Sequence, residues 1–365
     1  MDGEVPIGAG PPTVTSRPRT VNGRAVAVAL KGLAVVLVLM VLTSASKLLA
    51  WTPPILVSHS ITSLEIVRIG GINQHLLIRG ESKTNPVLLF LHGGPGMPAM
   101  YLAHSFQSAL EHDFVVVHWD QRGAGKSYDP AHTPVGSMNV NQFIADTRAL
   151  TVYLEARFHQ PKIFLLGHSW GSYLGMLTIW KHPELYQAYV GVGQIADSNA
   201  EAAIQDRFIV DSLARQGNWK AIRNYERDPA SMRENYLFEL HGELYRATDF
   251  TPLLVSGLTA PEYTMFDALN VQRGPQFAAQ HMRYNVISGP LMDAVQQVQV
   301  PVYFFIGRHD YTTPTPLALA YFDRISAPSK SLVWFDQSAH FAFFEEPAKF
   351  AVEMKSVRDR TLTNM

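Results

Sequence analysis

An apolar run at residues 163–166 passes directly into the pentapeptide Gly167-His-Ser-Trp-Gly171. This G-x-S-x-G pattern is typical of a sharp turn from a strand into a helix, on which the side chain of Ser169 would be exposed. Glycines two residues before and two residues after the serine let the backbone fold back on itself without a clash of side chains. Residues 172–180 are compatible with the helix that the pattern requires. The segment therefore predicts a nucleophile elbow within a fold that alternates strands and helices.

Strand-like and helix-like stretches alternate from residue 63 onward, which is typical of an α/β sheet with helices on both faces. Residues 64–69 and 74–79, joined through Gly70-Gly71, predict an antiparallel hairpin. Short apolar runs predict parallel strands that are buried on both faces, at residues 87–91, 114–118, 163–166, 188–192, 302–306 and 331–335. The sequence therefore predicts a mostly parallel eight-stranded sheet.

One long stretch, residues 197–289, lacks strand patterning and lies between the sixth and seventh of these eight runs. Open α/β sheets keep their sites at the carboxyl ends of the strands, so this stretch predicts a helical lid over that edge. The core of the fold is then expected in two parts, residues 52–196 and 290–365.

The composition excludes several classes of function. With 365 residues, of which 47% are hydrophobic and 17% charged, the chain is long and apolar enough for one large domain with an insertion. A net charge of −1 without a basic run in the body argues against nucleic-acid binding. The chain has no cysteine, which excludes disulfides, thiolate metal sites and cysteine nucleophiles and leaves the redox compartment open.

The amino-terminal part has a different character. Residues 1–24 are rich in Gly, Pro and Thr and predict a disordered tail, while residues 25–51 form a hydrophobic segment. This segment fits a signal anchor with Trp51 at the far membrane interface. It also fits a signal peptide with small residues at 43–46 where cleavage could occur. Either interpretation predicts a membrane-anchored or secreted protein, with its body on the extracytoplasmic side.

Two further residues complete a catalytic pattern with Ser169. Asp310 and His340 each follow the end of a predicted strand, and the order Ser169, Asp310, His340 is that of the α/β-hydrolase triad. His340 would take the proton of the attacking serine, and Asp310 would orient the imidazole and stabilise its cation. His309 and Asp336 are the alternative base and acid. We rank them lower, because His309 directly precedes the proposed acid and Asp336 precedes the turn that carries His340.

The pentapeptide His92-Gly-Gly-Pro-Gly96 follows the predicted strand at 87–91. Acyl transfer needs backbone N–H groups that point at the developing oxyanion, and one of them usually comes from the residue after the nucleophile. We therefore expect the oxyanion hole to use the N–H groups of Trp170 and Gly94. The alternative is a Gly-Pro turn without a chemical role.

Cofactor and metal motifs are not met. The segment ending in Gly125-Lys-Ser127 has Asp120 where a P-loop requires glycine, so nucleotide binding is not expected. The histidines show no His-Glu-x-x-His or comparable spacing, so neither a metal site nor a bound cofactor is expected.

Several motifs together resemble the proline iminopeptidases (prolyl aminopeptidases) of the α/β-hydrolase superfamily. They are His92-Gly-Gly-Pro-Gly96, Asp120-Gln-Arg-Gly-Ala-Gly-Lys-Ser127, Gly167-His-Ser-Trp-Gly171 and Gly191-Val-Gly-Gln194, with the placed Asp310 and His340. The resemblance implies an α/β-hydrolase fold and a serine hydrolase that removes an amino-terminal residue, often proline, from small peptides without a metal. The same core motifs occur in relatives that cleave esters, lactones or other amides, so the resemblance specifies the mechanism better than the substrate.

The lid is where the chain departs from this pattern. The resemblance implies acidic lid side chains that hold the free amine of the substrate, and Glu239 and Glu243 are the candidates. Their spacing of four places them on one face of a predicted helix. The alternative is a solvated helix surface. The hydrophobic amino-terminal segment is a second departure, since the usual member of the family is soluble.

These observations support a serine hydrolase that acts through an acyl-enzyme, with aminopeptidase activity on small peptides as the first expectation. The alternative enzyme is an esterase or lipase-like hydrolase, because the aromatic residues of the lid and a membrane-proximal position suit a hydrophobic acyl substrate. A third possibility is a non-catalytic surface recognition module of the same fold.

Overall fold

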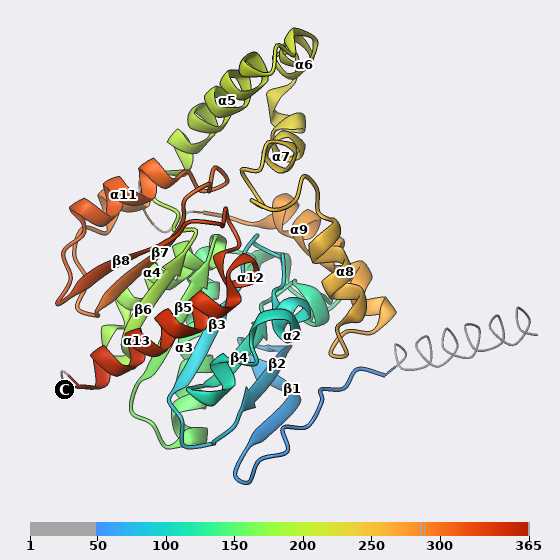
Figure 1. Cartoon of the computed structure of the whole chain (residues 1–365). Coiled ribbons are helices and arrows are strands. Elements are labelled where there is room, and N and C mark those ends of the chain that lie inside the picture. The colour runs from blue at the N-terminus through green and yellow to red at the C-terminus, as the bar shows by residue number, and fades with distance from the viewer. Residues whose placement is uncertain (1–48, 285–286, 288, 364–365) are drawn as a thin grey trace, which may run out of the picture. The chain divides into compact units, whose positions relative to one another are not determined.

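The computed structural model describes residues 49–284, 287 and 289–363 (Figure 1). Contacts divide the chain into two units, residues 1–46 and 47–365, and all described residues belong to the second. The predicted tail and all but the last three residues of the predicted hydrophobic segment, 25–51, lie outside the described part. Within that part, no helix has both the length and the apolarity needed to cross a membrane.

Eight strands form a single sheet with the order β1-β2-β4-β3-β5-β6-β7-β8. Their bounds are β1 (Ile61–Ile69), β2 (Ile72–Gly80), β3 (Val87–Leu91), β4 (Val115–Asp120), β5 (Ile163–His168), β6 (Tyr186–Val192), β7 (Val302–Gly307) and β8 (Lys330–Phe335). β2 runs antiparallel to β1 and β4, and every other pairing is parallel. The mostly parallel sheet and its opening hairpin are thus confirmed. The hairpin turns at Gly70 and Gly71, whose φ angles of +54° and +85° favour glycine.

Helices cover both faces of this sheet (Figure 1). Outside the lid they are α2 (Ala103–Phe106), α3 (Val140–Phe158), α4 (Trp170–Lys181), α10 (Leu291–Ala294), α11 (Thr315–Arg324), α12 (Ala342–Glu345) and α13 (Pro347–Thr363). Successive strand residues point to opposite faces, so each strand contributes to two apolar cores. Leu89 and Leu165 belong to the core under α3 and α4, whereas Phe90 and Leu166 belong to the core under α2, α12 and α13.

Burial on both faces holds for the central strands but not for the last one. β3, β4, β5 and β7 are buried along their whole length. In β8 only Phe335 is buried, so the prediction of a doubly buried strand at 331–335 is wrong. The physical reason is its position, because β8 is the last strand of the sheet and pairs only with β7.

The helical lid predicted between the sixth and seventh strands is present and has two parts. Its helices are α5 (Ser198–Arg215), α6 (Trp219–Tyr225), α7 (Pro229–Glu239), α8 (Thr251–Thr259) and α9 (Met265–His281). Helices α5 to α7 share a small core of their own, in which Ile209, Tyr225 and Leu237 are buried. Helices α8 and α9 pack on the body through short 3₁₀ turns, η1 (Met100–Leu102) and η3 (Gly125–Ser127) respectively.

Candidate active site

The turn around Ser169 has the strained geometry that the G-x-S-x-G pattern requires. β5 ends at His168, α4 begins at Trp170, and Ser169 between them has φ +54° and ψ −121°. A Cβ on Gly167 would lie 2.2 Å from the carbonyl oxygen of Gly171, and one on Gly171 would lie 2.1 Å from the carbonyl oxygen of Leu91. Both positions therefore require glycine, and the tight turn is what exposes the serine at the end of the strand.

Asp310 and His340 meet beyond the ends of β7 and β8. The Nδ1 atom of His340 lies 2.9 Å from Oδ2 of Asp310, and both side chains are buried. Asp310 also accepts hydrogen bonds from the backbone N–H and the hydroxyl of Thr313, at 2.9 and 2.8 Å. A Cβ on Gly307 would lie 1.9 Å from the carbonyl oxygen of Ala339, so this glycine lets the loop that carries His340 approach the end of β7. Because Asp310 engages Nδ1, the other ring nitrogen, Nε2, is the one that can take a proton from the nucleophile.

The charges around the imidazole favour its protonated form. Burial opposes the cation of His340, but the Asp310 carboxylate, and behind it Glu243 and Glu201, raise its pKa to about 9. The arrangement stabilises the imidazolium that forms when the ring takes a proton from serine. In the described part of the chain no hydrogen bond joins the Ser169 hydroxyl to this ring. Such bonds are often long in free enzymes and shorten when substrate binds.

The loop after β3 lies against the nucleophile. A Cβ on Gly93 would be 3.2 Å from Cβ of Ser169, and Gly94, with φ +109°, is next in the chain. Trp170 is the first residue of α4, so its N–H belongs to the helix end whose donors have no partner within the helix. Both donors predicted for the oxyanion hole, Gly94 and Trp170, are therefore beside Ser169.

Gln121, in the segment after β4, forms hydrogen bonds with residues of two other motifs. Its backbone N–H donates to Nε2 of His92 at 3.0 Å, and its side-chain oxygen accepts from the indole N–H of Trp170 at 3.1 Å. It thus connects the loop after β3 with the first residue of α4. Lys126, in the same segment, pairs through its ammonium with Asp267 at 2.6 Å.

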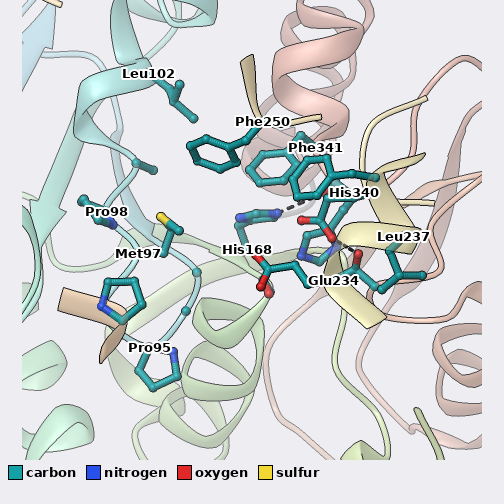
Figure 2. A pocket seen from close by; sticks show the side chains of 18 of the residues that line it. Pro95, Met97, Pro98, Leu102, His168, Glu234, Leu237, Phe250, His340 and Phe341 are labelled. Atoms are coloured by element: carbon teal, nitrogen blue, oxygen red, sulfur yellow. Dashed lines mark hydrogen bonds between the residues drawn. The ribbon is translucent and has the colours of Figure 1, made fainter. Parts of the chain in front are cut away.

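Gly93, Gly94, Ser169 and His340 line one cavity of about 560 Å³ between the sheet and the lid. Figure 2 shows Pro95, Met97 and Pro98 of the loop after β3 on one side, and His340 with Glu234 and Leu237 on the other. Much of the wall is apolar, and its apolar lining includes Met97, Leu102, Leu237, Phe250, Phe341 and Phe343. The volume suits a small substrate, with few polar groups to orient it.

The two glutamates proposed for the lid do not lie together. α7 ends at Glu239, where the backbone N–H groups of Gly242 and Glu243 fold back onto the carbonyl of Leu237 at 2.7 and 3.2 Å. His241, which lies between Glu239 and Glu243, has a left-handed backbone with φ +62°. The prediction of one shared helical face is therefore wrong. Glu239 is exposed and is not part of the cavity wall, whereas Glu243 lines the cavity.

Glu243 is held close to the imidazole. Its carbonyl oxygen accepts from the backbone N–H of His340 at 3.0 Å, and its carboxylate accepts from the hydroxyl of Thr312. Burial raises the pKa of Glu243 to about 7, although His340 and the Thr312 hydroxyl oppose the rise. A carboxylate in this position changes its charge near neutral pH and favours a cationic neighbour.

Three further side chains lie at or near the site, although no motif in the sequence indicates them. Glu234, on α7, lines the cavity near Glu243. Glu201 is in the first turn of α5, and burial together with the Asp310 carboxylate raises its pKa to about 7, while His340 opposes the rise. His168 lines the cavity, and its Nε2 atom is 3.1 Å from the carbonyl oxygen of His340. They belong to separate elements, so no spacing in the sequence marks them as a group.

The alternative base and acid have other partners. His309 stacks on the ring of Tyr245 with 4.1 Å between the centroids, and Asp336 pairs with Arg308 at 2.6 Å on the surface. Neither is part of the cavity wall. Over residues 49–284, 287 and 289–363, no three or more histidine, aspartate or glutamate side chains are placed to hold a metal ion.

Comparisons with known proteins agree with this geometry. A family model described as the alpha/beta hydrolase fold matches residues 86–347. A probable aminopeptidase of Bacillus subtilis, YbaC, is 33% identical over 302 residues, which cover 80% of this chain and 95% of that protein. A proline iminopeptidase of Lactiplantibacillus plantarum is 25% identical over 308 residues, covering 78% of this chain and 96% of the relative.

A solved structure shares the fold. The crystal structure of proline iminopeptidase from Mycobacterium smegmatis superposes with a TM-score of 0.61 at 19% identity, and the match covers 83% of this chain and all of that one (100%). The strand order, the strained serine after β5 and the sequence matches agree with one another. The chain therefore belongs to the α/β-hydrolase family and is a prolyl aminopeptidase-like member of it.

Proposed function

We propose that the protein is a serine aminopeptidase of the proline iminopeptidase type, which releases amino-terminal residues from small peptides through an acyl-enzyme. One observation carries the proposal. Ser169 and His340 line the same cavity as two lid carboxylates, Glu234 and Glu243. A nucleophile and an anionic subsite in one small cavity suit a substrate whose scissile carbonyl is close to a free ammonium group.

The reaction follows from the positions of these groups. The hydroxyl of Ser169 attacks the scissile carbonyl, and its proton passes to Nε2 of His340. The N–H groups of Trp170 and Gly94 stabilise the oxyanion. The tetrahedral intermediate expels the amine of the shortened peptide, which takes the proton from His340 and leaves an acyl-enzyme. Water, deprotonated by His340, then attacks the ester and releases the amino-terminal residue and free Ser169.

The lid supplies the selectivity for a free amino terminus. The ammonium of the substrate would lie against Glu243 and Glu234, whose charges compensate it in a largely apolar cavity. A peptide that continues on the amino side of the scissile residue has no ammonium there for these carboxylates to compensate. This favours an aminopeptidase over an endopeptidase.

The test compares variants on two substrates, a proline amide fluorogen and a short-chain nitrophenyl ester without an amine. Both are measured at a pH at which the rates no longer change. Ser169→Ala should abolish both activities. Glu243→Gln should lower kcat/KM for the amide at least about tenfold, as expected for the loss of one charged hydrogen bond, and leave the ester within about threefold.

Glu239→Gln is the matched control, because Glu239 is exposed and outside the cavity wall. It should leave both substrates unchanged. An equal loss on amide and ester in Glu243→Gln would mean that this carboxylate does not bind the amine.

An esterase is the second candidate, and the apolar wall of the cavity favours it. Met97, Leu102 and Phe250 offer contact to an acyl chain rather than to a peptide. Serine-dependent turnover of the ester without any turnover of the amide would select this alternative.

We also propose that residues 25–51 place the body on the extracytoplasmic side of a membrane, as an anchor or as a cleaved signal peptide. The apolar composition of this segment supports the proposal. The mass of the mature protein separates the two forms. Full-length protein in the membrane fraction indicates the anchor, loss of about 45 residues indicates cleavage, and full-length protein in the cytoplasm contradicts both.

A further inference from the structure

The corner of the lid between α8 and α9 has an unusual surface. Apolar side chains there are each more than half exposed, and they are Leu254, Val255, Leu258, Met265, Phe266 and Leu269. From residue 250 to residue 266 the only charged side chain is Glu262, which is buried. We call the six exposed residues the apolar corner. Isolated exposed leucines are ordinary on a protein surface, but a group of this kind marks an interaction site.

In the described part of the chain, residues outside the apolar corner hold α8 and α9 to the body. α8 packs through its opposite face, where Leu253 is buried and the Ser256 hydroxyl bonds to Ser105. α9 is held by the ion pair of Asp267 with Lys126 and by Asn270, which donates to the carbonyl of Gly125 at 3.1 Å. Both helices are thus fixed by other residues, and their apolar side chains remain available to a partner.

The chain enters the fold at this corner. The backbone N–H of Trp51 donates to the carbonyl of Pro261, between α8 and α9, at 3.1 Å. The hydroxyl of Thr52 donates to Glu262 at 3.0 Å and accepts from Arg79 at 2.6 Å. Trp51 is itself half exposed, at 50%. Trp51, the last residue of the hydrophobic segment at 25–51, and Thr52 after it are therefore fixed beside the apolar corner.

We propose that the apolar corner lies on a lipid surface, with the exposed side chains of α8 and of the start of α9 at the boundary between headgroups and acyl chains. A hydrophobic segment that enters the bilayer holds this corner at the membrane, with Trp51 at the interface. Apolar side chains and the absence of exposed charge match what an interfacial site needs. The orientation also matters for the cavity, because Phe250, directly before α8, and Pro275, on α9, are part of its wall. Substrate would then enter close to the lipid surface.

The absence of cysteine allows a direct test, because a fluorophore that reacts with thiols will attach only at a single introduced cysteine. Full-length Leu258→Cys and Phe266→Cys, each carrying an environment-sensitive fluorophore, are reconstituted into phosphatidylcholine vesicles with nitroxide-labelled acyl chains. The matched control is Val352→Cys on α13, because Val352 is 66% exposed and Phe266 is 65% exposed. Labelling of Ser169 by a fluorophosphonate shows that each variant is folded, and it is a separate readout from peptidase activity.

The expected result is nitroxide quenching at least threefold stronger at positions 258 and 266 than at position 352. Equal, weak quenching at all three positions overturns the proposal, as does a failure of the full chain to sediment with vesicles. A blue-shifted fluorophore in lipid-free protein at every concentration would mean that residues of the same chain cover the corner. A blue shift that grows with protein concentration would mean a second copy, and both results also overturn the proposal. None of these outcomes depends on which bond the enzyme cleaves.

Discussion

At the scale of single residues, the chemistry depends on the charges around one imidazole. His340 has Asp310 as its hydrogen-bonded partner and Glu243 and Glu201 as more distant carboxylates, which together outweigh burial and raise its pKa to about 9. The ring must be neutral to take the proton of Ser169. The activity of the free enzyme should therefore increase with pH up to about this value. A bound substrate ammonium beside Glu243 would offset part of this negative charge and help His340 to lose its proton.

The first prediction concerns this pH dependence. Glu243→Gln removes a negative charge that favours the imidazolium, so the pKa of His340 falls. The pH at which kcat/KM reaches half its maximum should decrease by about one unit, the lower end of the range for a charge within a few ångströms. The measurement is the pH profile of kcat/KM for an uncharged nitrophenyl ester. Glu239→Gln should leave the profile in place, and an increase of the half-maximal pH in Glu243→Gln would contradict the assignment.

At the scale of elements, the elbow depends on how closely α4 approaches β3. A methyl group on Gly171 would lie 2.1 Å from a backbone carbonyl of β3, that of Leu91, and backbone cannot move as a flexible side chain can. The start of α4, with the N–H of Trp170, would be pushed away from the loop that carries Gly94. Stability and catalysis are thus coupled at this one position.

The second prediction follows from that contact. Gly171→Ala should destabilise the protein by about 1–3 kcal/mol, as overpacking does. It should also slow ester turnover at least about tenfold, which is part of the roughly hundredfold or larger effect of losing one oxyanion donor outright. Gly136→Ala is the control, because Gly136 is exposed and a Cβ there meets nothing within 4 Å. It should change stability by less than about 0.5 kcal/mol. Urea unfolding and the kcat of the ester give both quantities, and unchanged values for Gly171→Ala would refute the role of this contact.

Some parts of the fold and of the site could be predicted from the sequence, and others could not. The strands and the elbow have local causes, since continuous apolar runs and paired glycines determine them within a few residues. The end of α7 also had a weak local signal, because Gly242 lies between Glu239 and Glu243 and glycine disfavours a continuous helix. The residue that ends the helix with a left-handed backbone is His241, which sequence does not mark for this role. The meeting of Glu243, Glu234 and Glu201 near His340 had no such signal. It depends on how three lid segments pack over two strand ends, which no spacing in the sequence encodes.

At the scale of the whole molecule, a buried ion pair joins distant parts of the sheet and its helices. Arg122, after β4, pairs with Asp146 of α3 at 2.9 Å, and neither side chain is exposed to solvent. The guanidinium also donates to the carbonyl of Gly70 in the β1–β2 turn at 2.9 Å, and Asp146 accepts from Gln74 of β2 at 3.0 Å. The segment that contains Gln121 is therefore fixed to the hairpin and to α3. The motif at residues 120–127, which carries part of the resemblance to the family, contains Gln121 and Arg122, but only the fold shows how Arg122 is tied to Asp146 and the hairpin.

The last prediction tests this support. Asp146→Asn removes one charge of the pair and replaces one of the two carboxylate oxygens, which accept from Arg122 and Gln142, by an amide NH2 that can only donate. The guanidinium then stays buried without a counter-charge, so the free energy of unfolding should fall by about 3–5 kcal/mol. Asp336→Asn is the control, because it breaks the exposed pair with Arg308, which solvent screens, and should cost far less. Urea unfolding measures the free energy of unfolding of both variants. Equal decreases would mean that burial does not determine how much the Arg122 pair contributes to stability. The kcat of folded Asp146→Asn should fall as well, because Arg122 follows Gln121, which connects His92 to Trp170; an unchanged kcat would confine the pair to a role in stability.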